Sequence, residues 1–90
     1  MIEKTFKIVN QTGLDAKISS ILVSTCSKYD CEILLWRAKI NVNLKSIMGV
    51  MSLNIHKGEI VDITFSGVDE EDAAIDVVNT IDKIKLAKEI

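Results

Sequence analysis

The chain has 90 residues, of which 48% are hydrophobic and 27% charged, and its formal net charge is −2. This length fits one domain around one core, and the composition is typical of a globular domain rather than a disordered one. No apolar run approaches the roughly 20 residues that span a bilayer, and the N-terminus carries no secretion signal. The lysines are scattered and only four residues are aromatic, so the sequence shows neither a basic patch nor a base-stacking platform for nucleic acid. We therefore expect one cytoplasmic domain, residues 1–90, with no membrane or direct nucleic-acid partner.

The N-terminal third predicts a strand, a loop and a helix in that order. Ile2 to Val9 alternates apolar with polar side chains, as a half-buried strand does. Gly13 marks a loop, and Asp15 is a favourable N-cap for a helix over about Ala16 to Ser27.

The middle third predicts two short strands and a short helix. Glu32 to Trp36 and Ile40 to Asn43 are typical of strands joined by a tight turn around Arg37-Ala38-Lys39. Ser46 is a favourable N-cap for a helix that ends near Leu53.

The C-terminal third predicts one strand and one longer helix. Lys57-Gly58 indicates a turn, and Glu59 to Phe65 alternates as a strand. Four acidic residues, 69 to 72, open the helix, and Lys83, Lys85 and Lys88 lie near its end, as the helix dipole favours.

This order of elements, with short connections, predicts an α+β domain in which helices cover one face of an antiparallel sheet. Cys26 and Cys31 admit a disulfide or half of a metal site, but one histidine and no second cysteine pair argue against zinc. We expect free, buried or half-buried thiols, as in a reducing compartment. No residue constellation indicates an independent active site, a metal centre or a cofactor.

Two stretches carry a family resemblance. Residues 42 to 53 resemble the regulatory-serine segment of HPr, the histidine-containing phosphocarrier of the sugar phosphotransferase system, and residues 12 to 18 resemble its phosphorylation loop. Shorter matches lie at residues 4 to 6, 27 to 30 and 57 to 58. The resemblance implies an open-faced β-sandwich with four strands in the order 1-4-2-3 and three helices on one side.

The phosphorylation loop departs from the family pattern. Asp15 stands where the family carries its phosphoryl-accepting histidine, Lys17 replaces an arginine, and Ile18 replaces a proline. A carboxylate here would have to form an acyl phosphate, and Lys17 supplies only a point charge to offset the repulsion. Three interpretations of Asp15 stay open: a helix N-cap, a cap whose charge is also read by a partner, and a phosphoryl acceptor. His56, the only histidine, is expected in a solvated turn, and transfer through it also stays open.

The resemblance implies that Ser46 is phosphorylated from ATP by an HPr kinase/phosphorylase. A phosphoserine suits a helix N-terminus, and Lys45 adjoins it in sequence. We predict that Lys17 and Lys45 bind a phosphate or a partner. The resemblance also implies that Ile47, Met48 and Met51 face enzyme I, the kinase and a catabolite-control transcription factor. Periodicity alone leaves open that Ser46 is only a cap and that Ile47, Val50, Met51 and Leu53 pack inward.

The uncovered face of the sheet is a second candidate surface. If Ile33 and Leu35 face the helices, Leu34 and Trp36 must face outward, and Ile60 shares that side. Such a patch often marks association, so a homodimer or a partner here is one hypothesis and scattered surface residues are the other.

Together these features predict a regulatory module similar to the catabolite-repression HPr-like proteins, not an enzyme. Residual phosphotransfer through Asp15 or His56, and a scaffold used only for protein interaction, are the alternatives.

Overall fold

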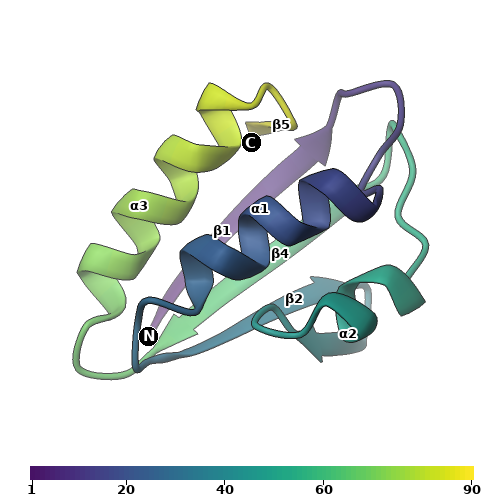
Figure 1. The fold of residues 1–90 in the computed structure, drawn as a ribbon. Coiled ribbons are helices and arrows are strands. Elements are labelled where there is room, and N and C mark those ends of the chain that lie inside the picture. The colour runs from purple at the N-terminus through teal and green to yellow at the C-terminus, as the bar shows by residue number, and fades with distance from the viewer.

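The computed structural model describes residues 1–90 and places three helices over one face of an antiparallel sheet, leaving the other face open (Figure 1). The elements in chain order are β1 (Ile2–Ile8), α1 (Ala16–Cys26), β2 (Glu32–Arg37), β3 (Ile40–Asn43), α2 (Ile47–Ser52), β4 (Ile60–Ser66), α3 (Glu70–Lys83) and β5 (Ala87–Glu89). The expected α+β layering is confirmed.

The sheet has five strands in the order β3-β2-β4-β1-β5, all antiparallel. The predicted order 1-4-2-3 is confirmed for the first four strands, but the prediction of only four strands is wrong. The segment around Lys88, predicted as the end of a helix, is a fifth strand in which Lys88 pairs with Lys7.

The end of α3 explains the additional strand. Lys85 has a φ of +56°, the Leu86 N–H donates to the Ile81 carbonyl, and the Lys85 N–H donates to the Asp82 carbonyl. These two bonds around a left-handed residue are a Schellman motif, which ends a helix and turns the chain. Glycine usually occupies that position, so lysine gave no signal in the sequence. The chain then returns along β1, where the Ile90 N–H donates to the Thr5 carbonyl at 2.9 Å.

Alternation along the strands places the core as predicted. Val61, Ile63 and Phe65 of β4 are at most 3% exposed, and Ile33 and Leu35 of β2 are at most 1% exposed. Burial of each such side chain contributes about 1.5–3 kcal/mol. The sheet's inner face and the helices above it share one core of 21 buried residues.

None of the three helices combines the length and the hydropathy that crossing a bilayer requires.

Candidate functional site

Asp15 caps the N-terminus of α1. Its backbone is extended, and its Oδ1 accepts the Ile18 N–H at 2.9 Å. Its Oδ2 accepts the Thr12 hydroxyl at 2.7 Å. A carboxylate that accepts an otherwise unpaired N–H of the first turn is the standard solution for a helix start. Both oxygens of Asp15 are therefore engaged in shaping the loop.

These bonds also fix the charge of Asp15. The Ile18 N–H, and after it the Thr12 hydroxyl, hold the pKa of Asp15 below its ordinary value of 3.8, and the Lys17 charge adds least. Asp15 is thus an anion at neutral pH. Across the chain, no three His, Cys, Asp or Glu side chains come together in a way that could hold a metal ion.

Gly13 fastens this loop to the segment that follows α2. The Leu14 N–H donates to the Ile55 carbonyl at 3.1 Å, and Gly13 has a φ of +63°. A Cβ at Gly13 would lie 2.3 Å from the Ile55 oxygen and 2.9 Å from the His56 Cα, closer than atoms can approach. Only glycine fits both the conformation and the space.

His56 therefore lies beside the loop that carries Asp15. Its side chain is exposed, and its backbone N–H donates to Glu59 Oε2 at 2.6 Å. The sequence predicted a solvated position before β4, which the exposure confirms, but gave no sign that the backbone touches Gly13.

Ser46 caps α2 in the same way that Asp15 caps α1. Its backbone is extended, and its Oγ accepts the Gly49 N–H at 3.1 Å. Ser46 is half-buried, as is Asp15.

The apolar side chains of α2 divide between two faces. Val50 is 0% exposed and Leu53, which ends the helix, is 5% exposed. Ile47, Met48 and Met51 are exposed, and Met48 reaches 84%. The interpretation in which Ile47 and Met51 also pack inward is therefore wrong. We call these three residues the α2 patch.

Lys45 has a defined partner away from the hydroxyl of Ser46. Its Nζ donates to the Tyr29 carbonyl at 2.6 Å, which ties the start of α2 to the chain after α1. Tyr29 in turn donates its hydroxyl to Asp76 Oδ2 at 2.6 Å and so links this segment to α3. Lys17 is exposed at the opposite end of α1. The partner-binding roles of both lysines stay predictions.

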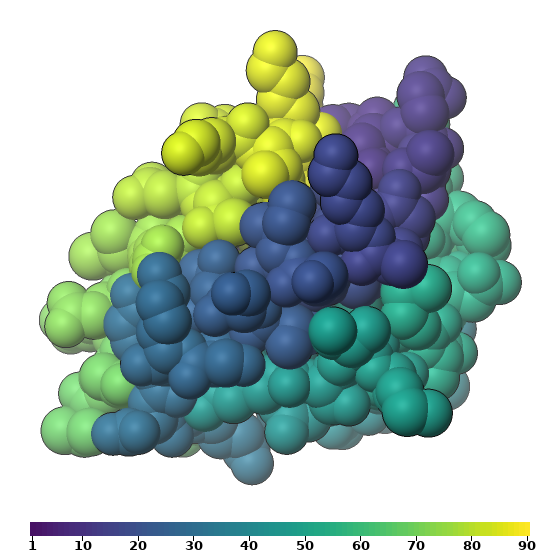
Figure 2. Space-filling model, viewed as in Figure 1, coloured from purple at the N-terminus to yellow at the C-terminus, as the bar shows by residue number.

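The Asp15 loop and the α2 patch belong to one side of the molecule. Both lie on the helix-covered face, where the dark blue segment that contains residues 12–17 adjoins the teal surface of α2 and its following loop (Figure 2). The Leu14–Ile55 bond joins the Asp15 loop to the segment that follows α2. The fold thus presents an anion, a half-exposed serine and exposed methionines on one surface.

The two thiols do not offer a second site. Burial raises the pKa of Cys26 to about 12, and burial with the Asp69 hydrogen bond raises that of Cys31 to about 11. Both are buried and protonated at neutral pH, which makes them poor nucleophiles and poor metal ligands.

A family comparison agrees with this architecture. Residues 2–83 match the family model described as the PTS HPr component phosphorylation site. The chain belongs to the HPr family.

Solved structures of HPr proteins superpose on nearly the whole chain. The histidine-containing phosphocarrier protein of a mycoplasma has a TM-score of 0.93 at 29% identity, over 97% of this chain and 99% of its own. An HPr of Thermoanaerobacter tengcongensis has a TM-score of 0.87 at 40% identity, over 92% and 93%. The Bacillus subtilis catabolite-repression protein Crh, an intertwined dimer with a swapped domain, has a TM-score of 0.72 at 28% identity, over 92% and 95%.

The open face of this HPr-family sheet carries the second predicted surface. Leu34 and Trp36 are half-buried, and the Trp36 Nε1–H donates to Thr64 Oγ1 at 3.0 Å. Ile60 is 52% exposed, and Asp62 and then Thr64 follow it on the same face of β4. Leu34 and Trp36 are neighbours on the open face of β2, with Thr64 and Asp62 of β4 opposite them. Association through the three apolar residues stays a prediction.

Sequence reasoning missed three contributors to the site: Thr12 as a donor to Asp15, Ile55 as the partner of Leu14, and Tyr29 as the acceptor for Lys45. Gly13 was the one available signal for the first two, because a glycine in a loop indicates a positive φ or a close approach.

Proposed function

We propose that this HPr-family protein is a regulatory binding module, switched by phosphorylation of Ser46 rather than by carrying a phosphoryl group on residue 15. One observation carries the proposal. Asp15 Oδ1 caps α1 and Asp15 Oδ2 accepts the Thr12 hydroxyl, so both carboxylate oxygens are engaged, whereas the half-buried Ser46, whose Oγ caps α2, directly precedes the exposed α2 patch. The protein acts in the cytoplasm through protein partners and has no active site of its own.

Asp15 is a poor phosphoryl acceptor for physical reasons. Attack on a phosphoryl group would bring two anions together, and Asp15 belongs to no group of three His, Cys, Asp or Glu side chains that could hold a cation. The product would also lose either the Oδ1 bond that caps the helix or the Oδ2 bond with the Thr12 hydroxyl. These costs support a binding role for Asp15, which presents a constant negative charge to a partner.

Ser46 is suited to a reversible charge. Transfer of the γ-phosphoryl group of ATP to Oγ releases ADP and the hydroxyl proton, and it adds roughly −1.5 to −2 charge at the start of α2. The unpaired N–H groups of the first turn favour that charge. Because the α2 patch follows directly, one partner surface can read the phosphate with a basic group and Met48 with an apolar pocket.

The proposed partners follow from this arrangement. An HPr kinase/phosphorylase acts on Ser46, and a catabolite-control transcription factor reads the phosphorylated form. Enzyme I docks on the Asp15 loop and the α2 patch without transferring its phosphoryl group. The structural likeness to Crh, named for catabolite repression, supports this regulatory assignment.

The deciding experiment has two labelling arms. The protein is incubated with enzyme I and phosphoenolpyruvate, and separately with HPr kinase and ATP, and the phosphorylated residue is mapped by mass spectrometry. We expect label only from ATP and only on Ser46, with none on Ser46→Ala. Asp15→His is the matched variant that restores an imidazole, and it should gain label from phosphoenolpyruvate. Label on Asp15 from phosphoenolpyruvate would contradict the proposal.

A second candidate, transfer through His56, is favoured by one contact. The His56 backbone lies against Gly13, so the imidazole is near the loop that a phosphoryl donor would approach. Label from phosphoenolpyruvate that disappears in His56→Gln and survives in Asp15→Asn would favour this candidate over the first.

A homodimer through Leu34, Trp36 and Ile60 is a separate proposal. Trp36→Glu should raise the fraction of monomer in sedimentation velocity runs, with Glu32→Gln on the same strand as a control. An unchanged distribution would argue against this surface.

A further inference from the structure

The outer edge of β1 is only half covered. On the β4 side, the Ile8 N–H donates to the Glu59 carbonyl, and the Ile8 carbonyl accepts the Gly58 N–H. Hydrogen-bonding direction alternates along a strand, so even-numbered residues of β1 face β4 and odd-numbered residues face β5. The bond from Ile90 to the Thr5 carbonyl agrees with this alternation.

The free half of this edge comprises residues 2–5. β5 pairs with Phe6, Lys7 and Ile8 only, and the Ile90 bond to Thr5 is its last contact. The N–H and carbonyl of Glu3 and the N–H of Thr5 therefore point outward without a strand partner. Unpaired groups of this kind are a template for an added strand.

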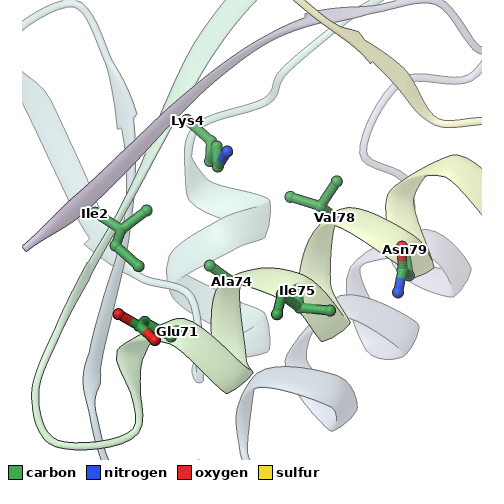
Figure 3. A pocket seen from close by; sticks show the side chains of 7 residues that line it. All are labelled: Ile2, Lys4, Glu71, Ala74, Ile75, Val78 and Asn79. Carbon is green, nitrogen blue, oxygen red and sulfur yellow. The ribbon is translucent and has the colours of Figure 1, made fainter.

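A groove lies beside the same residues. It runs between β1 and α3, has a volume of about 380 Å³, and Figure 3 shows Ile2 and Lys4 on one wall with α3 side chains on the other. Its lining residues are Ile2, Lys4, Glu71, Ala74, Ile75, Val78 and Asn79. The groove is thus mainly apolar, with Lys4, Glu71 and Asn79 at its margins.

The edge and the groove have compatible geometry. A strand added in line with β5 would run antiparallel to β1 at about 4.8 Å, with every second side chain directed toward the helices. The side chain opposite Lys4 would enter the groove between Ile75 and Val78. The side chain two positions later would lie opposite Ile2, next to Glu71, which makes no ion pair of its own.

We propose that the free β1 edge and this groove bind an extended segment of a partner protein with the pattern apolar-x-basic. The backbone of the segment pairs with Glu3 and Thr5, its apolar side chain fills the groove, and its basic side chain meets Glu71. This is strand addition, in which main-chain bonds give affinity and alternate side chains give specificity.

A second copy of the chain is a poorer occupant. Pairing of two β1 edges in the registers that use these free groups places Glu3 opposite Glu3 or Lys4 opposite Lys4. Like charges directly opposite each other destabilise a strand pair. The charges at the margins of the groove instead complement a foreign segment with a basic residue.

The test uses a phage-displayed library of random linear peptides selected on the wild-type protein. Peptides that bind are synthesised and titrated into ¹⁵N-labelled protein. We expect the apolar-x-basic pattern among them and amide shifts confined to residues 2–5 and 71–79. Enrichment of no peptide, or shifts centred on α2 and the Asp15 loop, would overturn the proposal.

Three variants distinguish a loss of edge pairing from a general disruption of the fold as the cause of weaker peptide binding. Glu3→Pro removes an outward N–H, a change that edge strands tolerate, and it should weaken peptide binding about tenfold, as the loss of one or two hydrogen bonds predicts. Glu3→Ala should bind within about twofold of wild type, since it keeps that N–H. Ile75→Asp, at a side chain that is 62% exposed, should also weaken binding while the fold is retained. If the three variants bind the peptide equally well, a foreign segment is refuted as the occupant. A wild-type dimer that Glu3→Pro dissociates would refute it as well.

Discussion

The N-termini of α1 and α2 use the same capping bond with different chemistry. Asp15 Oδ1 accepts the Ile18 N–H at 2.9 Å, and Ser46 Oγ accepts the Gly49 N–H at 3.1 Å. One helix therefore starts with a permanent anion, and the other starts with a neutral hydroxyl that a kinase can charge. The same local geometry can thus serve a fixed signal or a variable one, and the capping atom decides which.

The two helix starts also differ in how firmly they are held. Gly13 is pressed against the Ile55 carbonyl, whereas a Cβ at Gly49 would meet Ser46 and Val42 at ordinary contact distances of 3.4–3.5 Å. The N-terminus of α1 is thus packed tightly against a neighbouring loop, whereas the N-terminus of α2 is loosely packed. The four predictions below test this difference.

Alanine substitution of the two glycines should give the largest contrast. Gly13→Ala forces a Cβ into the Ile55 oxygen at a positive φ, so we expect a loss of about 2–4 kcal/mol in the free energy of unfolding. Gly49→Ala lies within α2 and should gain about 0.5–1 kcal/mol. Urea unfolding followed by circular dichroism measures both. Equal effects of the two changes would mean that the loops are not fastened as described.

Removal of the α2 cap should have the next largest effect. Ser46→Ala leaves the Gly49 N–H without its acceptor and should cost about 1 kcal/mol in the same urea experiment. Ser46→Asp keeps an acceptor and adds a charge that the helix N-terminus favours, so it should retain most of the stability. A Ser46→Asp protein less stable than Ser46→Ala would contradict the proposed accommodation of a phosphate.

Acid should distinguish the two caps. The pKa of Asp15 is lowered on folding, so its stabilising contribution is complete above about pH 5 and is lost as the pH falls through 3.8 toward the folded value. Asp15→Asn keeps a capping oxygen without a charge, so its stability should fall less steeply over this range. Thermal melts from pH 2.5 to 6 test this, and the difference between the two proteins cancels the other acids, Asp69, Glu70 and Asp76, whose pKa values are also lowered. Parallel curves would show that Asp15 is not held as described.

The smallest effect on stability is expected at the α2 patch. Met48 is 84% exposed, so Met48→Asp should change the free energy of unfolding by no more than about 0.5 kcal/mol. The same change should slow the ATP-dependent labelling of Ser46, because it places a charge on the proposed docking surface. An unchanged labelling rate would remove Met48 from that surface.

The sequence predicted the elements whose signals are local. Period-two alternation identified β1 and β4, two short runs joined by a tight turn indicated β2 and β3, and the side chains of Asp15 and Ser46 identified two helix starts. β5 has three residues, too few for a period to appear, and Lys85 ends α3 in a conformation that its residue type does not announce. Periodicity also left α2 undecided, since a six-residue helix can turn several faces inward.

The contacts that assemble the candidate site depend on tertiary structure. The Leu14–Ile55 bond and the Lys45–Tyr29 bond join segments far apart in the chain, and neither has a spacing rule. The open edge at Glu3 likewise depends on where β5 stops. The residue type did indicate that position 13 needs a glycine, but it did not indicate that the glycine lies against Ile55.

The close contact between Gly13 and the Ile55 carbonyl affects how a partner binds to the helix-covered surface. Because the loop and the segment after α2 are already locked together, docking requires little ordering of the backbone, and less of the interaction energy is spent on lost conformational freedom. Partners should therefore bind this surface with little conformational change. A single added phosphate can then change the affinity without having to order the surface first.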